Sequence, residues 1–248
     1  MNTLEILGIA AAAALGGFAA LVIACRGHED PPFPSIVRAL NCILMASMHR
    51  VRVYDYAGRR IREALPRTGA CIVVANHRSG ADPMVVARSS RRWIWFLMAR
   101  EYYEKFEWFF SRIGCIPVKR DGNDLASTRQ ALKALKNGRV IGIFPQGGII
   151  ENDDDIDFSK AGVALLASRT GAPVIPMFIA GSPMHDNVFK ATLLIPSRSR
   201  VYCGKPLEFE SGDQKPTREE LDAFTARLRD AVLHLRAVAR GAERTVAS

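Results

Sequence analysis

The sequence lacks closely spaced cysteines. Its cysteines are odd in number, lie far apart and form no Cys-x-x-Cys pair: Cys25, Cys42, Cys71, Cys115 and Cys203. This spacing argues against a disulfide framework and against a zinc knuckle, so we expect reduced thiols that are mostly buried. The chain also lacks internal repeats and low-complexity linkers, which favours a single domain for its main part.

The N-terminus lacks basic residues. Met1 to Glu5 contains no Lys or Arg, which disfavours a cleaved signal peptide because such peptides begin with a positive region. Residues 6–25 carry no charge, and a helix of this length spans roughly 30 Å, the thickness of a bilayer core. Basic residues begin only at Arg26, so the sequence predicts a membrane anchor with the body of the protein on the cytoplasmic face. A buried helix of a soluble protein is the alternative.

A proline-rich break precedes a second apolar stretch, residues 35–48. This stretch is too short and too polar to span a bilayer comfortably. It is predicted to be either an interfacial helix, with Arg38, His49 and Arg50 toward the lipid headgroups, or an amphipathic core helix. We therefore assign residues 1–50 to a membrane anchor and an interfacial helix.

Residues 51–248 alternate short β-rich runs with helical patterns, which predicts one α/β domain with a mixed, largely buried β-sheet flanked by helices. The apolar run Cys71 to Ala75 is typical of a central strand buried on both faces. A capping box of Thr217 and Glu220 begins the last helix. The expected strands are 51–56, 71–75, 93–99, 140–144 and 174–180, with a pair around Leu193 and Val201; the expected helices are 82–89, 101–113, 124–136, 159–169 and one from Thr217.

One polar segment, residues 76–83, lies between a predicted buried strand and a predicted helix. It contains His77 and Asp82, and a loop that folds back would let the Asp82 carboxylate accept a hydrogen bond from the imidazole. That bond would leave the other ring nitrogen as a general base. Each residue also has a structural explanation, with Asp82 as a helix N-cap and His77 as a loop residue that bonds backbone.

The wider string Asn-His-x-Ser-x-x-Asp at Asn76 to Asp82 resembles the first motif of the glycerolipid acyltransferases of the lysophosphatidic acid (1-acyl-sn-glycerol-3-phosphate) acyltransferase type. Further blocks follow in the family's order, and together they cover roughly residues 35–210. They are Gly-Cys-Ile-Pro-Val-Lys-Arg at 114–120, Phe-Pro-Gln-Gly-Gly at 144–148, Phe-Ser-Lys-Ala-Gly at 158–162 and Val-Ile-Pro-Met at 174–177.

The resemblance implies transfer of an acyl group from a thioester, acyl-CoA or acyl-ACP, to a hydroxyl of a membrane lipid. His77 would act as general base oriented by Asp82, and backbone N–H groups around Gly147 would stabilise the oxyanion. It implies no resident cofactor and no metal. A nucleophilic Ser79 is disfavoured because Ser79 lacks a Gly-x-Ser-x-Gly elbow. The substrate-binding residues implied are Asn76, Ser79, Lys119, Arg120, Phe144, Pro145, Gln146, Gly147 and Lys160.

The third block departs from the family. Gln146 replaces the usual glutamate, and Gly148 to Ile150 replaces Thr-Arg-Ser. The missing arginine is a natural partner for an acceptor phosphate, so either Lys119, Arg120 or Lys160 compensates or the acceptor is not a phosphomonoester. A lysophospholipid other than lysophosphatidic acid, a lyso-aminolipid and a glycolipid are the candidate acceptors. The acidic residues 151–157 are interpreted as a solvated loop rather than a cation site, because they lack the EF-hand glycine.

The formal net charge of +9 has several explanations. The basic residues are spread along the chain without a nucleic-acid-binding module, so nucleic acid is not an expected partner. Attraction to anionic lipid headgroups accounts for the same excess, and membrane lipids are the expected partners. A catalytically silent lipid-binding protein with the same fold is the alternative from another functional class.

Overall fold

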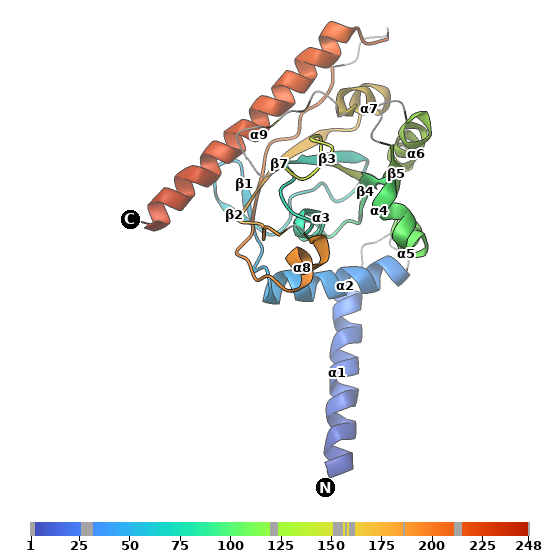
Figure 1. Ribbon diagram of the computed structural model, residues 1–248, viewed down its shortest axis with the longest axis vertical. Helices are drawn as coiled ribbons and strands as arrows, with labels where there is room; N and C mark the ends of the chain where they lie inside the picture. Colours follow the sequence, from blue (N-terminus) through green and yellow to red (C-terminus); the bar gives the residue numbers. More distant parts are fainter. Residues whose placement is uncertain are drawn as a thin grey trace.

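Figure 1 shows the computed structural model of the chain, in which a twisted sheet is covered by helices. The structure describes residues 3–25, 32–119, 124–150, 156, 158, 162–185, 187–210 and 215–247. Within them, one sheet of eight strands has the order β2-β1-β8-β7-β3-β6-β4-β5. The strands are β1 Arg52–Asp55, β2 Arg60–Ile61, β3 Cys71–Ala75, β4 Ile94–Ala99, β5 Ile116–Val118, β6 Val140–Ile143, β7 Val174–Ala180 and β8 Arg200–Cys203.

The sheet is mixed, as predicted. Strands β7, β3, β6, β4 and β5 are parallel neighbours, whereas β8 runs antiparallel to β7 and pairs in parallel with β1. Strand β2 is antiparallel to β1. Because parallel strands end on the same side, the residues that follow β7, β3, β6, β4 and β5 meet along one edge, which we call the C-terminal edge.

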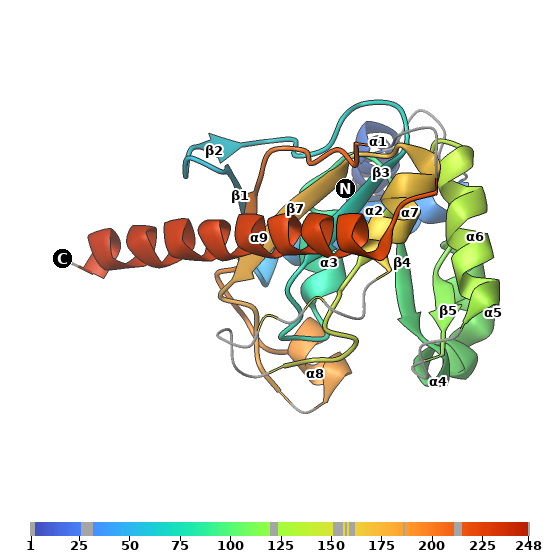
Figure 2. The same cartoon turned by 90° about the horizontal axis from the view of Figure 1, so that it is seen from above.

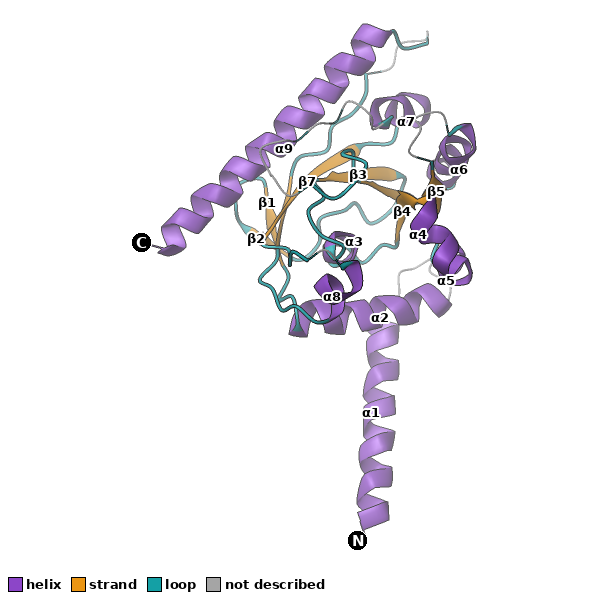
Figure 3. Cartoon of the chain, in the orientation of Figure 1, coloured by secondary structure: helices purple, strands orange, loops and turns teal. Residues whose placement is uncertain are grey.

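Helices cover both faces of the sheet (Figure 3). Strand β3 explains why, since its side chains alternate between two cores: Ile72 and Val74 enter one, Cys71 and Val73 the other. The first core contains residues of α6, α7 and α9, and the second contains residues of α2 and α3. The helices are α1 Thr3–Cys25, α2 Pro32–Ser47, α3 Asp82–Ala87, α4 Arg100–Tyr103, η1 Glu104–Phe106 (a 3-10 turn), α5 Glu107–Arg112, α6 Leu125–Lys136, α7 Val163–Thr170, α8 Val188–Leu193 and α9 Arg218–Ala247.

The long helix α9 begins where the capping box predicts. The Thr217 backbone N–H donates to Glu220 Oε2 at 2.7 Å, and the Glu220 N–H donates to Thr217 Oγ1 at 3.2 Å. The apolar side of α9, including Phe224, Leu228 and Val232, is buried in the first core. Figure 2 shows α9 crossing one face of the sheet and extending past β1 and β2.

The two N-terminal helices are placed differently relative to the body of the domain. Helix α1 projects away from it, while α2 lies along its base (Figure 1). The side chains of residues 6–12 and 25, part of the predicted anchor, lie outside the described residues. Within the described part of the chain, we find no helix that combines the length and the hydropathy needed to cross a membrane.

Arg38 of α2 and His49, which follows α2, were predicted to face lipid headgroups, and this prediction is wrong. Arg38 is 5% exposed, and its guanidinium lies 5.4 Å from the centre of the Trp93 ring. His49 is fully buried and bonds Ser197 and the Thr192 backbone. Both side chains therefore join the helix to the domain, and α2 instead exposes the apolar side chains of Ile36, Leu40 and Ile43.

Three predicted elements differ from the structure. The strand around Leu193 is instead helix α8, which Asn187 caps by accepting from the Lys190 N–H. The predicted helix 101–113 is divided into α4, η1 and α5 because Phe106 leaves helical dihedral angles. Helix α7 begins at Val163 after Gly162, whose φ is +56°, and residues 159–161 of its predicted start lie outside the described residues.

The described cysteines are free, as predicted. Cys71, Cys115 and Cys203 are buried and Cys42 is half-buried, while the Cys25 side chain lies outside the described residues. Burial raises the pKa of Cys71 to about 11 and that of Cys115 to about 12. Because the thiolate is the nucleophilic form, these two thiols are inert at neutral pH.

Candidate active site

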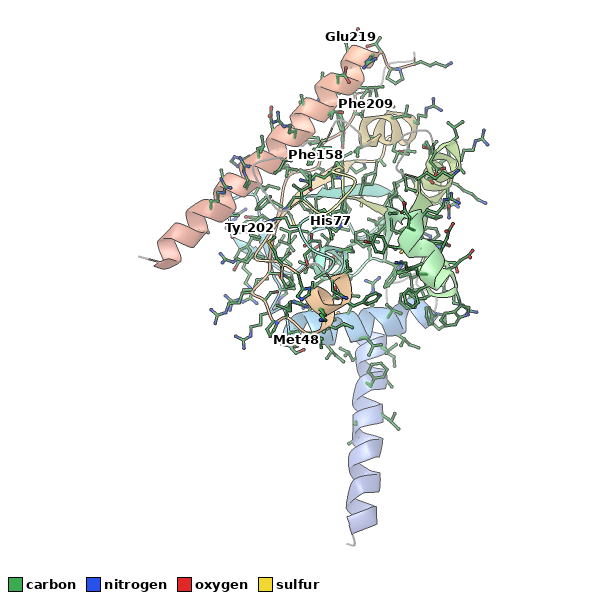
Figure 4. All side chains as sticks on the ribbon, in the orientation of Figure 1. Met48, His77, Phe158, Tyr202, Phe209 and Glu219 are labelled. Atoms are coloured by element: carbon green, nitrogen blue, oxygen red, sulfur yellow. The ribbon has the colours of Figure 1, made fainter. Side chains whose placement is uncertain are left out.

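The C-terminal edge of the sheet gathers polar residues from distant parts of the sequence. His77 follows β3, Gln146 follows β6 and Ser182 follows β7, and these three strands are neighbours. Arg100 and Lys119 follow β4 and β5 along the same edge. Figure 4 shows the labelled His77 near the middle of the domain, above α2 and away from α1. Such edges are where open α/β sheets bind ligands.

His77 and Asp82 are in contact, as the sequence predicted. His77 Nδ1 lies 3.0 Å from Asp82 Oδ2, and Asp82 is 1% exposed. The same carboxylate oxygen accepts from the backbone N–H groups of Arg78 and Ser79, each at 2.7 Å. These contacts make the carboxylate an acceptor, so Nδ1 carries the proton and Nε2 is the ring nitrogen that can receive one.

Asp82 does not cap its helix, contrary to the structural explanation considered for it. Helix α3 begins at Asp82 itself, with Ala81 in the cap position and no side-chain capping bond. The carboxylate turns back toward the loop instead, where it accepts the Arg78 and Ser79 N–H groups. Asp82 therefore organises the segment that carries His77.

The His77 ring is supported by an aromatic stack. It packs on the Phe144 ring with centroids 4.3 Å apart, and Phe144 stacks on Phe96 at 5.7 Å. Gly142 makes room for this stack, because a Cβ there would lie 2.4 Å from the Phe96 ring. Phe144 was predicted to bind substrate, and in the structure its ring packs against the His77 imidazole.

Gln146 clamps the backbone of His77. Its Oε1 accepts from the His77 N–H at 2.7 Å, and the His77 carbonyl accepts from the Ile150 N–H at 2.9 Å. This contact was not foreseen for Gln146, which was predicted to bind substrate. An amide oxygen and a carboxylate oxygen can both accept this bond, so the glutamine retains the acceptor while removing a negative charge beside the imidazole.

Replacing Gln146 with leucine is expected to lower the free energy of unfolding by about 1–3 kcal/mol, because the half-buried His77 N–H loses its acceptor. Gln146→Glu keeps an acceptor and should remain close to wild-type stability. Chemical denaturation of the two variants measures the difference. An equal loss of stability in both variants would contradict a stabilising hydrogen bond between Gln146 and the His77 backbone.

The other residues predicted in the first and third blocks have structural contacts. The Asn76 amide bonds both backbone groups of Ile179 on β7, at 2.7 and 3.1 Å. The Ser79 hydroxyl is buried and accepts from the Ala81 N–H, and Pro145 is also buried. The Gly147 N–H, considered as an oxyanion donor, donates to the Phe144 carbonyl at 3.2 Å and closes a turn.

A basic corner, Arg100 and Lys119, lies at the β4–β5 end of the C-terminal edge around Asp124. The Asp124 carboxylate accepts from the Ser127 and Lys119 N–H groups and lies 3.7 Å from the Arg100 guanidinium. Hydrogen bonds from Ser127 and then Lys119, with the nearby Arg100 charge, hold the pKa of Asp124 well below its ordinary value. Arg120 and Lys160, both predicted to bind substrate, lie outside the described residues.

Sequence reasoning missed Arg100 and Ser182. Each follows a strand of the parallel set directly or by one residue, and both strands were predicted. The position just after a buried strand was the signal that could have identified them. Nothing local in the sequence indicated which of the residues after strands would contact Asp82 or Asp124.

Comparisons with known proteins agree on one family. The Acyltransferase family model matches residues 58–180. A 1-acyl-sn-glycerol-3-phosphate acyltransferase of Bacillus subtilis is 24% identical over 196 residues, which are 78% of this chain and 92% of that protein. An N-acylphosphatidylethanolamine synthase of Arabidopsis thaliana is 26% identical over 159 residues, which are 56% of each chain.

The fold also has a counterpart among solved structures. The crystal structure of the 1-acyl-sn-glycerophosphate acyltransferase PlsC from Thermotoga maritima superposes with a TM-score of 0.63 at 18% identity. The match covers 91% of this chain and 88% of that one. A likeness at this identity concerns the fold, a central sheet flanked by helices.

Proposed function

This chain belongs to the glycerolipid acyltransferase family of the lysophosphatidic acid acyltransferase type and is an O-acyltransferase, and from that premise we propose that His77 is its general base and Asp82 the residue that orients it. The observation that supports this assignment is the 3.0 Å contact between His77 Nδ1 and the buried Asp82 carboxylate. An alcohol is a weak nucleophile at neutral pH, and an imidazole, whose ordinary pKa is near 6.5, is suited to remove its proton as attack develops.

The proposed reaction proceeds without an acyl-enzyme. His77 Nε2 takes the proton of the acceptor hydroxyl while its oxygen attacks the thioester carbonyl of acyl-CoA or acyl-ACP. The tetrahedral intermediate then collapses, the carbon–sulfur bond breaks, and the imidazolium returns the proton to the leaving thiolate. The products are an ester and a free thiol, so no further reactant is required.

We also propose that the acceptor differs from lysophosphatidic acid. Gln146 and the segment Gly148 to Ile150 offer no charged side chain for a phosphomonoester. Of the positive charges described at the C-terminal edge, Arg100 and Lys119 lie away from His77, where β4 and β5 end, whereas the Arg78 guanidinium beside His77 lies 3.2 Å from the Met184 sulfur. The relatives' names support a broad choice of acceptor, since one names a glycerol phosphate and another a phosphatidylethanolamine. A lysophospholipid or a lyso-aminolipid is the acceptor that we favour, with a glycolipid as the alternative.

Membrane association is part of the proposal. The outer side of α2 exposes Ile36, Leu40 and Ile43 at 41–52%. This apolar side continues onto η1, α5 and α8 through aromatic contacts: Phe33 of α2 touches Trp108, and Phe106 touches Phe189. Figure 1 places these elements on the side of the domain from which α1 projects. Exposed apolar and aromatic side chains of this kind suit a membrane interface.

We therefore propose that residues 1–50 form the membrane-directed segment and residues 51–248 the acyltransferase domain, which lies on the cytoplasmic face. The chain's formal charge of +9 supports contact with anionic headgroups at that face.

A panel of acceptors tests the proposed function. Vesicles carrying the protein are supplied with a labelled long-chain acyl-CoA or acyl-ACP and with lysophosphatidic acid, other lysophospholipids, a lyso-aminolipid or a glycolipid. We expect an acceptor without a terminal phosphomonoester to be acylated at least about tenfold faster than lysophosphatidic acid. Each unpaired phosphate charge should raise the activation free energy by more than about 1.4 kcal/mol, which is a factor of ten in rate. Selective acylation of lysophosphatidic acid would contradict the acceptor assignment. Transfer to none would favour a catalytically silent lipid-binding protein.

A further inference from the structure

The Asp82 carboxylate has a partner from a distant part of the chain. Its Oδ1 accepts from the Ser182 hydroxyl at 2.6 Å, across 100 residues of sequence. The other oxygen, Oδ2, accepts from His77 Nδ1 and from two backbone N–H groups. Ser182 is therefore the described side chain that holds the second oxygen of the residue orienting His77.

We infer that Ser182 is a positioning residue for acyl transfer: it fixes the rotation of the Asp82 carboxylate and thereby the direction of the His77 imidazole. This inference rests on the proposed function of His77. A carboxylate held at only one oxygen can rotate about its Cβ–Cγ bond, since that torsion is broad. A donor on each oxygen removes this freedom and keeps Oδ2 directed at Nδ1.

The fold places Ser182 through constraints on the residue before it. Gly181 follows β7 with φ at +73°, and a Cβ at this position would lie 2.8 Å from the Arg198 carbonyl oxygen. Two residues earlier, Ile179 is bonded to Asn76, which directly precedes His77. The ends of β3 and β7 are thus tied together, so Ser182 and Asp82 approach each other from fixed positions.

A buried polar chain supports the same turn from the other side. The Ser199 hydroxyl donates to the Gly181 carbonyl at 3.3 Å and lies 2.8 Å from the Ser197 hydroxyl. Ser197 in turn lies 2.9 Å from Nδ1 of the fully buried His49. The Thr192 carbonyl 2.7 Å from His49 Nε2 can only accept, so Nε2 carries a proton. These bonds connect the turn at Gly181 to the residues that follow α2.

The Ser182 bond also sets how strongly Asp82 stabilises a protonated His77. Donation to Oδ1 shares the carboxylate charge with a hydroxyl, and its removal leaves more charge to face the imidazolium. The other groups against His77 are the uncharged Phe144 ring and Gln146 amide. The neighbouring Arg78 guanidinium is directed at the Met184 sulfur, 3.2 Å away. Loss of the hydroxyl should therefore stabilise the protonated, inactive form of the base.

Kinetics of Ser182→Ala and Ser182→Thr on the best acceptor of the panel test the inference. We expect Ser182→Ala to lower kcat by about tenfold with KM for both substrates within about twofold, as for loss of one hydrogen bond to a charged group. The acidic limb of its pH–rate profile should move to higher pH. Ser182→Thr keeps the hydroxyl and should recover most of kcat and the wild-type profile. Ser168→Ala, which removes a half-buried hydroxyl that donates to the Leu165 carbonyl in α7, is the matched control.

A second readout does not depend on turnover. NMR of protein labelled with ¹⁵N-histidine follows the titration of His77, whose signal is identified by its absence from His77→Ala. A titration midpoint at higher pH in Ser182→Ala, but not in Ser168→Ala, supports the inference. This readout holds even if no acceptor is acylated, because a lack of acylation would count against the proposed function alone. An unchanged midpoint together with unchanged kcat, or a Ser182→Thr protein as impaired as Ser182→Ala, would overturn the role of Ser182.

Discussion

Acyl transfer is expected to fall by about 100- to 10,000-fold when His77 is replaced with alanine, the range that a positioned general base contributes. The loss should appear in kcat with every acceptor, because deprotonation of the attacking hydroxyl is common to all of them. Rates from the labelled thioester, measured beside wild type at equal amounts of vesicle-bound protein, give the ratio. The wild-type rate should rise with pH as the imidazole loses its proton, and this rise should be absent from the variant's residual activity.

Two control variants separate chemistry from folding in this experiment. His234→Ala removes an exposed histidine of α9 and should leave kcat unchanged. His77→Gln keeps a flat polar group beside Phe144 without a base and should be as inactive as His77→Ala. Wild-type rates in either His77 variant would exclude His77 as the general base.

Asp82→Asn is expected to lower kcat by about 100-fold or more and to destabilise the fold by about 1–3 kcal/mol. The carboxylate accepts four hydrogen bonds, from His77, Arg78, Ser79 and Ser182. An asparagine amide must turn its NH₂ group toward some of these donors, so at least one buried donor loses its acceptor. The imidazole then loses the partner that fixes its tautomer, which leaves Nε2 a poorer base.

The matched control for this change is Asp222→Asn, which alters an exposed carboxylate of α9. Thermal or chemical denaturation should show a loss of stability in Asp82→Asn and little change in the control. If the Asp82 variant kept more than about a tenth of the wild-type kcat, orientation by Asp82 would be a minor contribution to catalysis.

Local sequence patterns predicted the features that arise from contacts between residues close together in the sequence. The predicted Thr217–Glu220 capping box forms, because it joins groups three residues apart. The His77–Asp82 contact was also predictable, since both residues lie in one short segment of the sequence. The strand predicted around Leu193 failed because an apolar run there has no period long enough to distinguish strand from helix, and Asn187 caps it as α8.

Side-chain burial was less predictable than secondary structure. Arg38 and His49 are polar residues near an apolar stretch, which suggested contact with headgroups, yet both are buried. Their partners, Trp93 and Ser197, come from elsewhere in the chain. A buried polar group is stable only with such partners, and their arrival depends on the fold as a whole.

The sequence by itself determined the His77–Asp82 contact, the α/β class and the family, because these depend on residue types at short, ordered spacings. Tertiary structure alone decided what surrounds the pair. The order β7-β3-β6 brings the residues after three distant strands to one edge, so that Gln146 bonds the backbone of His77 and Ser182 bonds Asp82. A contact between groups 69 or 100 residues apart is set by strand pairing, and no local spacing encodes it.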